Sequence, residues 1–246
     1  MMAETATREE FLAAILARLI LDPAAPPARH IAVGAASPIP AAACWLVKKR
    51  GHDVRLSLLH KTHGNPFSEG TRELFDLTGQ GRIDLFFLGG GEIDGEANIN
   101  LIGTGEWPGR EARFPGSFGS AFMYLMTPRT ILFREEHTTR VLVPRVAFVS
   151  APGISPPGHF RRGTAQALVT GRAVFRFDGG RFALASYHRG ETPATIAAAT
   201  GFSYDLAPDL AETPDPSAED LALLRGPVCD EMRGTYPAFC ARVWGA

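Results

Sequence analysis

The 246-residue sequence contains few cysteines, almost no net charge and no long apolar run. Its three cysteines, Cys44, Cys229 and Cys240, are too few and too irregularly spaced for a disulfide framework or a zinc site, which need paired or clustered thiols. The 25 basic and 26 acidic residues give a net charge of −1 without a block of like charges, unlike a typical nucleic-acid-binding protein. We therefore expect no metal site and no nucleic-acid partner.

The short apolar runs and the low cysteine content also indicate the cellular compartment. No apolar run reaches the ~18 residues that a membrane-spanning helix needs, so no membrane partner is expected. Residues 1–10 lack the basic-then-apolar order of a signal peptide, and the low cysteine content suits a reducing compartment. We therefore expect a cytoplasmic protein.

The composition that is present is typical of a globular protein, with 45% hydrophobic and 21% charged residues. Its 26 glycines and 19 prolines indicate many tight turns. The length fits one large domain. We expect a single domain over residues 1–246, in which residues 1–29 form an N-terminal helix and lead-in and residues 226–246 a C-terminal tail.

The first third of the chain alternates between helix and strand patterns. Thr7 and Glu10 have the spacing of a capping box, and helical periodicity then continues to about Asp22. Strand patterns follow at residues 30–33, 54–59 and 83–88, and helix patterns lie between them at residues 40–49 and 71–77. This alternation predicts an α/β fold with an open, mainly parallel sheet flanked by helices.

The rest of the chain follows another pattern. Residues 92–120 are rich in Gly, Asn and Pro and predict a long structured loop. Strand patterns then occur at residues 130–133, 141–149, 167–177 and 181–187, the last two flanking Asp178-Gly179-Gly180 as a hairpin. Residues 193–200 and 217–225 read as helices. We expect an added antiparallel hairpin region here.

Glycine-rich turns follow two of the predicted strands, at residues 34–38 and at Gly89-Gly90-Gly91. Ligands of open α/β sheets bind beyond the carboxyl ends of the strands, where glycine lets a ligand approach the backbone. Glycine also simply permits a sharp strand exit. Position alone leaves both interpretations open.

Several motifs in order carry a family resemblance. They are residues 88–94 (LGGGEID), 98–100 (NIN), 102–103 (IG), 113–117 (RFPGS), 146–153 (VAFVSAPG), 187–190 (YHRG), 200–202 (TGF) and 213–217 (TPDPS). Together they resemble the β-type subunit of family I CoA-transferases, particularly the glutaconate CoA-transferase group. The resemblance covers about residues 31–225.

The resemblance implies a Rossmann-like fold and a hetero-oligomer in which this chain pairs with an α-type subunit. It implies an acyl-CoA thioester as substrate and no permanently bound cofactor. In the family, a glutamate of the β-type half attacks the thioester and forms a glutamyl-CoA intermediate. The residues that would contact CoA are Gly89, Gly90, Gly91, Gly116, Ser117 and Gly119.

The sequence departs from the family at the glutamate. That residue follows the second strand, where this chain has Leu58-Leu-His-Lys-Thr-His-Gly64 without a carboxylate. Alignment on Gly64 puts Thr62 at the glutamate's place, and one inserted residue would put Lys61 there instead. His60 and His63 are candidate general bases toward water, because histidine titrates near neutrality; they could equally be exposed loop residues. Phe118 also stands where the family has glycine.

Three functions remain open at this point. The chain is a β-type CoA-transferase subunit with catalytic residues at His60, Thr62 and His63 or a nucleophile on its partner. Alternatively, it belongs to a CoA-dependent hydrolase of a cyclic or β-keto acyl-CoA, or it is a non-catalytic structural or regulatory subunit.

Overall fold

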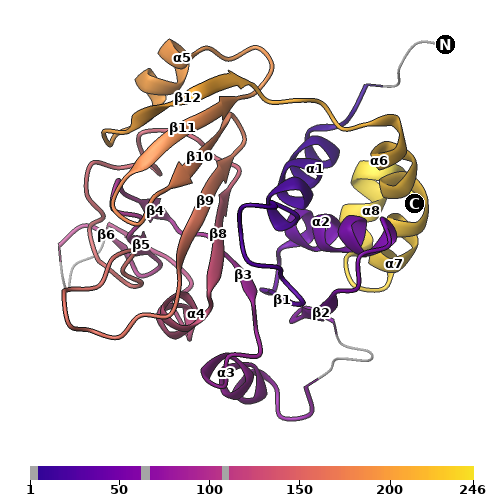
Figure 1. Ribbon diagram of the computed structural model, residues 1–246, viewed down its shortest axis with the longest axis horizontal. Helices are drawn as coiled ribbons and strands as arrows, with labels where there is room; N and C mark the ends of the chain where they lie inside the picture. Colours follow the sequence, from indigo (N-terminus) through magenta and orange to yellow (C-terminus); the bar gives the residue numbers. More distant parts are fainter. Residues whose placement is uncertain (1–4, 62–66, 107–110) are drawn as a thin grey trace. The chain divides into compact units, whose positions relative to one another are not determined.

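The computed structural model describes residues 5–61, 67–106 and 111–246 (Figure 1). The chain divides into two compact units. The first comprises Met1–Leu77, Arg82–Leu85 and Pro214–Ala246, and the second Thr78–Gly81 and Phe86–Thr213. The prediction of a single domain stays a prediction.

The first unit begins with helix α1 (Arg8–Ile20), whose start was predicted from local sequence. The Thr7 side chain accepts the backbone N–H of Glu10, and the Glu10 side chain accepts that of Thr7. This capping box satisfies N–H groups that a helix start otherwise leaves unpaired. Apolar residues at helical spacing, from Leu12 to Ile20, are buried.

Two parallel strands follow in this unit, β1 (His30–Val33) and β2 (Arg55–Leu58), with helix α2 (Pro38–Lys49) between them. All four residues of β1 are buried. Next come helix α3 (Thr71–Gly79) and strand β3 (Leu85–Leu88), the latter divided between the units after Leu85. The strand–helix alternation predicted for this part is confirmed.

The C-terminal segment folds back onto the helices of the first unit. It consists of α6 (Ala218–Leu223), the π-helix η1 (Leu224–Val228), α7 (Cys229–Arg233) and α8 (Pro237–Trp244). α6, η1 and α7 contact α2, and Figure 1 shows these yellow helices beside the indigo ones of the N-terminal part. The expected tail is therefore largely helical, and Phe239 and Cys240 in it are buried.

The second unit is built on strands that hydrogen-bond in the order β12-β11-β10-β9-β8-β3. Its long strands are β8 (Arg129–Arg134), β9 (Thr164–Thr170), β10 (Ala173–Phe177), β11 (Phe182–Tyr187) and β12 (Asp205–Glu212). β8 and β9 run parallel, as do β11 and β12, whereas β10 is antiparallel to both of its neighbours. The expected antiparallel addition is thus present. Helices α4 (Ser120–Met126) and α5 (Pro193–Ala199) complete this unit.

Two strand predictions in this unit are wrong. Residues 167–177 form two strands rather than one, because the chain turns at Gly171 and Arg172 between β9 and β10. Residues 141–149 form no strand and make one isolated bridge, from Leu142 to Ile93.

Residues 92–106 and 111–120 form mostly irregular structure, as predicted, with two small antiparallel strand pairs among them. These are β4 (Glu92–Ile93) with β5 (Ile99–Asn100), and β6 (Gly103–Thr104) with β7 (Ala112–Arg113). This segment carries the resemblance motifs at residues 98–100, 102–103 and 113–117 and part of the one at 88–94, so its hydrogen bonds show how those motifs pack.

Candidate functional site

His60 lies in the turn that follows β2, in the first unit. Leu59 still donates its backbone N–H to the carbonyl of Val33, and Lys61 donates to Leu58, which closes the turn. The His60 side chain is exposed rather than packed into the sheet. Its ring stacks on that of Tyr236, with centroids 4.9 Å apart and planes 7° apart.

Thr62 and His63, the other predicted catalytic residues, lie outside the described residues. Their roles therefore stay predictions.

Gly89, Gly90 and Gly91 follow β3 in the second unit, where neighbouring atoms leave no room for a side chain. A Cβ on Gly89 would lie 2.7 Å from the carbonyl oxygen of Phe133. A Cβ on Gly91 would collide with the ring of Phe114. Close packing thus requires glycine here, whether or not a ligand also approaches.

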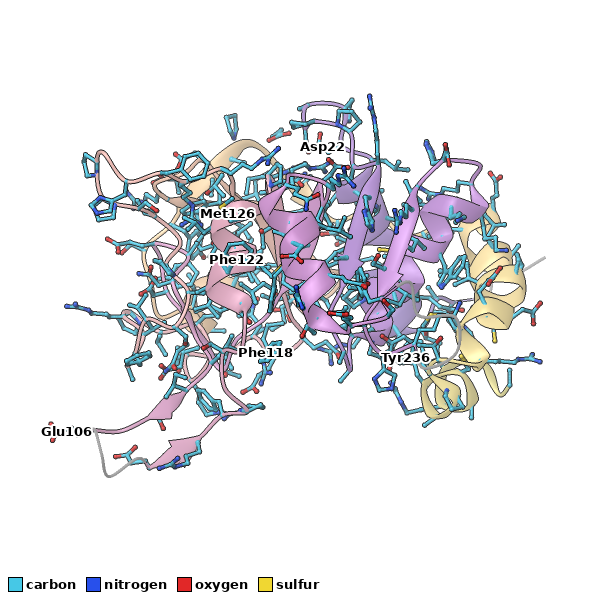
Figure 2. The ribbon with its side chains drawn as sticks, turned by 90° about the horizontal axis from the view of Figure 1, so that it is seen from below. Asp22, Glu106, Phe118, Phe122, Met126 and Tyr236 are labelled. Atoms are coloured by element: carbon cyan, nitrogen blue, oxygen red, sulfur yellow. The ribbon has the colours of Figure 1, made fainter. Side chains whose placement is uncertain are left out.

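Gly116, Ser117 and Gly119 lie in the loop that leads into α4. Gly116 has φ of +104°, a conformation that other residues rarely adopt, and open space at its Cβ position. Ser117 accepts the backbone N–H of Ser120, and Gly119 that of Met123, which starts the helix. Between them, Phe118 has φ of +43° and is 81% exposed. Figure 2 shows Phe118, Phe122 and Met126 in succession along this loop and α4.

The structure brings the two glycine segments together. Gly91 donates its N–H to the carbonyl of Asn100, and Gly116 donates to that of Leu101, the next residue. The Phe114 ring, two residues before Gly116, lies against Gly91. Both predicted CoA-contacting segments therefore flank one short stretch of backbone in the second unit.

Two buried carboxylates, those of Glu92 and Asp94, accept hydrogen bonds from residues around this stretch of backbone. Glu92 Oε2 accepts from Asn100 Nδ2 at 2.6 Å and from the backbone N–H of Ala147 at 2.9 Å. Asp94 accepts from the backbone and side chain of Asn98 and, at 3.3 Å, from the N–H of Val146. These carboxylates occupy the backbone donors of residues 146 and 147, which explains why a strand does not form there.

The motif residues thus have an architectural role that sequence reasoning missed. Asn98 Oδ1 accepts the N–H of Gly153, and Ser150 Oγ accepts that of Leu101. The motifs at residues 92–100 and 146–153 are therefore joined by hydrogen bonds. Their order in the sequence was the available signal, but it does not show which residues are bonded to which.

Metal-binding and membrane-spanning features are lacking in the described ranges. In the part of the chain that the structure describes, no group of three or more His, Cys, Asp or Glu side chains is arranged to hold a metal ion. Among the helices described, none is both long and apolar enough to cross a lipid bilayer.

Two curated relatives, both B subunits of CoA-transferases, are similar to this chain in sequence, although no family model matches it. The chain is 28% identical over 164 residues to the relative from the 3-oxoadipate CoA-transferase of Pseudomonas knackmussii. It is 29% identical over 143 residues to the relative from the glutaconate CoA-transferase of Acidaminococcus fermentans. The matches cover 63% and 54% of this chain and span 63% and 53% of the relatives' own lengths.

The chain resembles CoA-transferase B subunits. This confirms the resemblance drawn from the motifs.

Solved structures show the same fold. The decarboxylase AibA/AibB superposes with a TM-score of 0.75 at 23% identity, over 98% of this chain and 100% of the other. Glutaconate coenzyme A-transferase from Acidaminococcus fermentans gives a TM-score of 0.75 at 20% identity, over 90% and 94% of the two chains. The predicted fold class, a mainly parallel sheet flanked by helices with antiparallel additions, is therefore confirmed.

Proposed function

We propose that this chain is the β-type subunit of a CoA-transferase-like enzyme that acts on an acyl-CoA thioester together with a separate α-type subunit. Support comes from the two curated relatives, both named as B subunits of CoA-transferases. The motifs and their buried hydrogen-bond network add to it, because they keep the glycine segments of the resemblance side by side. The acyl-CoA is a substrate in this proposal, with no permanently bound cofactor.

The chemical part of the proposal rests on the residue types in the segment after β2. Residues 59–67, Leu-His-Lys-Thr-His-Gly-Asn-Pro-Phe, contain no carboxylate, and the imidazole of His60 is exposed there. A glutamyl-CoA intermediate on this segment is therefore chemically impossible. We propose that the chain forms no covalent thioester there and that its imidazoles serve acid–base chemistry.

An exposed imidazole favours hydrolysis as the second candidate function. In that reaction, a water oxygen attacks the thioester carbonyl carbon while His60 or His63 accepts the water proton. The C–S bond of the resulting tetrahedral intermediate then breaks, and the CoA sulfur leaves as the thiolate and takes up a proton. The products are a carboxylic acid and free CoA, and Thr62 stays a third candidate catalytic residue of this proposal.

The glycine segments have a separate place in the proposal. Gly91 and Gly116 donate their N–H groups to backbone carbonyls, so they would shape the site rather than bind the substrate by hydrogen bonds. We assign contact with CoA to Gly89, Gly90, Ser117 and Gly119, where glycine lets a ligand approach the backbone.

We also propose a hetero-oligomer in the cytoplasm. AibA/AibB is named by two components, and the curated relatives are named as subunits. Cys44, Cys229 and Cys240 are free and buried, which suits a reducing compartment. Light scattering of the chain with and without its α-type subunit tests the assembly.

Thioester loss tests the function. The chain, purified with its α-type subunit, is mixed with glutaconyl-CoA or 3-oxoadipyl-CoA, and loss of the thioester is followed with and without acetate. Loss that requires acetate supports transfer, whereas loss without an acceptor supports hydrolysis. No loss with either thioester would leave the chain a structural or regulatory subunit and overturn the proposal.

Covalent labelling tests the missing nucleophile. Borohydride is added after acyl-CoA, and the chain is analysed by mass spectrometry. We expect no CoA adduct and no reduced glutamate on this chain. Either modification would show that a carboxylate elsewhere in the chain acts as nucleophile.

A further inference from the structure

Tyr236 comes from the opposite end of the sequence to His60, yet the two rings stack within the first unit. Tyr236, labelled in Figure 2, precedes helix α8. A centroid distance of 4.9 Å and an interplanar angle of 7° define a parallel stack, which covers one face of the imidazole.

Tyr236 is held in place by burial and by hydrogen bonds of its backbone. Only 6% of the residue is exposed. Its backbone N–H donates to Met232 at 2.7 Å, and its carbonyl accepts from Cys240 at 3.1 Å, so hydrogen bonds hold both sides of its backbone. Burial raises the pKa of the Tyr236 phenol to about 12, although the nearby backbone N–H of Ser37 opposes the rise. The phenol is therefore neutral over the range in which enzymes operate.

His60, in contrast, belongs to an exposed turn. Within the described ranges, its ring makes no hydrogen bond that would fix its plane. Its plane lies parallel to the ring of Tyr236. A parallel stack uses the face of the imidazole and leaves its nitrogens, which lie in the ring plane, available for proton transfer.

We propose that Tyr236 is a positioning residue that holds the His60 imidazole beyond the carboxyl end of β2. The proposal rests on the proposed function, in which His60 exchanges a proton with water or substrate. An oriented base reacts faster than a freely rotating one, because the reacting geometry is already set before substrate binds. The C-terminal helices thereby contribute to the catalytic turn through one aromatic ring.

The test compares Tyr236→Leu, which removes the flat ring, with Tyr236→Phe, which keeps it. In the complex with the α-type subunit, using glutaconyl-CoA, Tyr236→Leu should lower kcat about tenfold and leave KM within about twofold. Tyr236→Phe should stay within about twofold of the unmodified chain. In a His60→Gln background, Tyr236→Leu should have no further effect, because the residue acts through His60.

A spectroscopic measurement detects the stack without using activity. In the full chain with isotope-labelled histidine, the ring protons of His60 are identified as the signals missing in His60→Gln. Those signals should move downfield in Tyr236→Leu, which loses the ring current, and stay close to their original positions in Tyr236→Phe.

These readouts separate the two proposals. If His60→Gln lowers kcat while Tyr236→Leu leaves it unchanged, positioning by Tyr236 is wrong and the proposed function stands. A Tyr236→Leu effect that persists undiminished in the His60→Gln background would show a structural role, and it also overturns positioning. If the complex consumes no thioester while the His60 signals still respond to Tyr236→Leu, the stack exists but the proposed function fails, and positioning for catalysis fails with it.

Discussion

Nδ2 of Asn100 donates a 2.6 Å hydrogen bond to Oε2 of Glu92, and both side chains are buried. The same oxygen of Glu92 accepts the backbone N–H of Ala147. One carboxylate therefore joins three segments of the second unit. Loss of this acceptor leaves the buried amide of Asn100 with one hydrogen bond, to the carbonyl of Gly103, whereas the N–H of the exposed Ala147 can turn to water.

Glu92→Ala should accordingly lower the free energy of unfolding by about 1–3 kcal/mol, the usual cost of one buried donor left without its partner. Urea denaturation of the purified chain measures it. Glu106→Ala is the matched control, because Glu106 lies in the same unit and is exposed. Equal midpoints for the two variants would mean that water replaces the carboxylate at no cost.

His137 makes the second unit sensitive to acid. Its ring nitrogens lie 2.7 Å from Thr170 Oγ1 and 2.9 Å from Thr200 Oγ1. Burial, and then the charge of Arg172, lower the pKa of His137 from 6.5 to about 4. The folded chain therefore keeps the ring neutral at pH values at which the unfolded chain already binds a proton.

Stability should be full above pH 6.5 and should fall as the pH drops from 6.5 to about 4, by about 3 kcal/mol from this histidine alone. His137→Gln cannot titrate in that range, so the pH dependence of its urea midpoint should be shallower. The exposed His159 provides the control, as His159→Gln should keep the original slope. Parallel pH profiles for all three proteins would contradict the assignment.

Glu10 of α1 and Arg225 of the C-terminal segment form an ion pair in the first unit. Arg225 donates to both carboxylate oxygens, at 2.7 and 3.0 Å, and the Glu10 side chain is fully buried. Burial alone would raise the pKa of Glu10, but hydrogen bonds from Arg225 and the Thr7 backbone lower it overall. The carboxylate is thus charged in the folded chain and depends on Arg225.

Arg225→Met should destabilise the chain by about 3–5 kcal/mol, because it leaves a buried charge uncompensated. Adding Glu10→Gln should recover part of this loss, since the amide carries no charge. Arg233→Met, at an exposed residue whose nearest carboxylate contact is 3.7 Å, is the control and should change stability little. Thermal unfolding measures all three variants. No recovery in the double variant would mean that lost packing, not charge, causes the effect.

The features that could be predicted from the sequence are those with local causes. The capping box of α1 involves residues three apart, and the hairpin turn at Asp178 depends on a side chain that accepts the N–H groups of Gly180 and Arg181. The failed strand at residues 141–149 has a distant cause. Glu92 and Asp94 take up backbone donors in that run, and no local pattern reveals this.

The same distinction applies to the candidate site. The motifs located the two glycine segments, and those segments do lie together, through Asn100 and Leu101. The contact between His60 and Tyr236 was not predicted, because a stack between residues so far apart leaves no spacing pattern in the sequence. Residues 226–246 were expected only as a tail for this reason.

The segment after β2 supplies the decisive activity measurement. His60→Gln and His63→Gln remove the two imidazoles of this segment, which flank Thr62. If one of them is the general base, its replacement should lower kcat about a hundredfold or more, the usual contribution of such a group, and should change the pH profile of kcat. His52→Gln is the control, because His52 is exposed in the same unit and precedes β2.

The sequence alone favours His63, which stands beside Thr62, whereas the stack on Tyr236 favours His60. A loss confined to one variant would identify the base. Unchanged kcat and pH profiles in both would assign the acid–base chemistry to the α-type subunit.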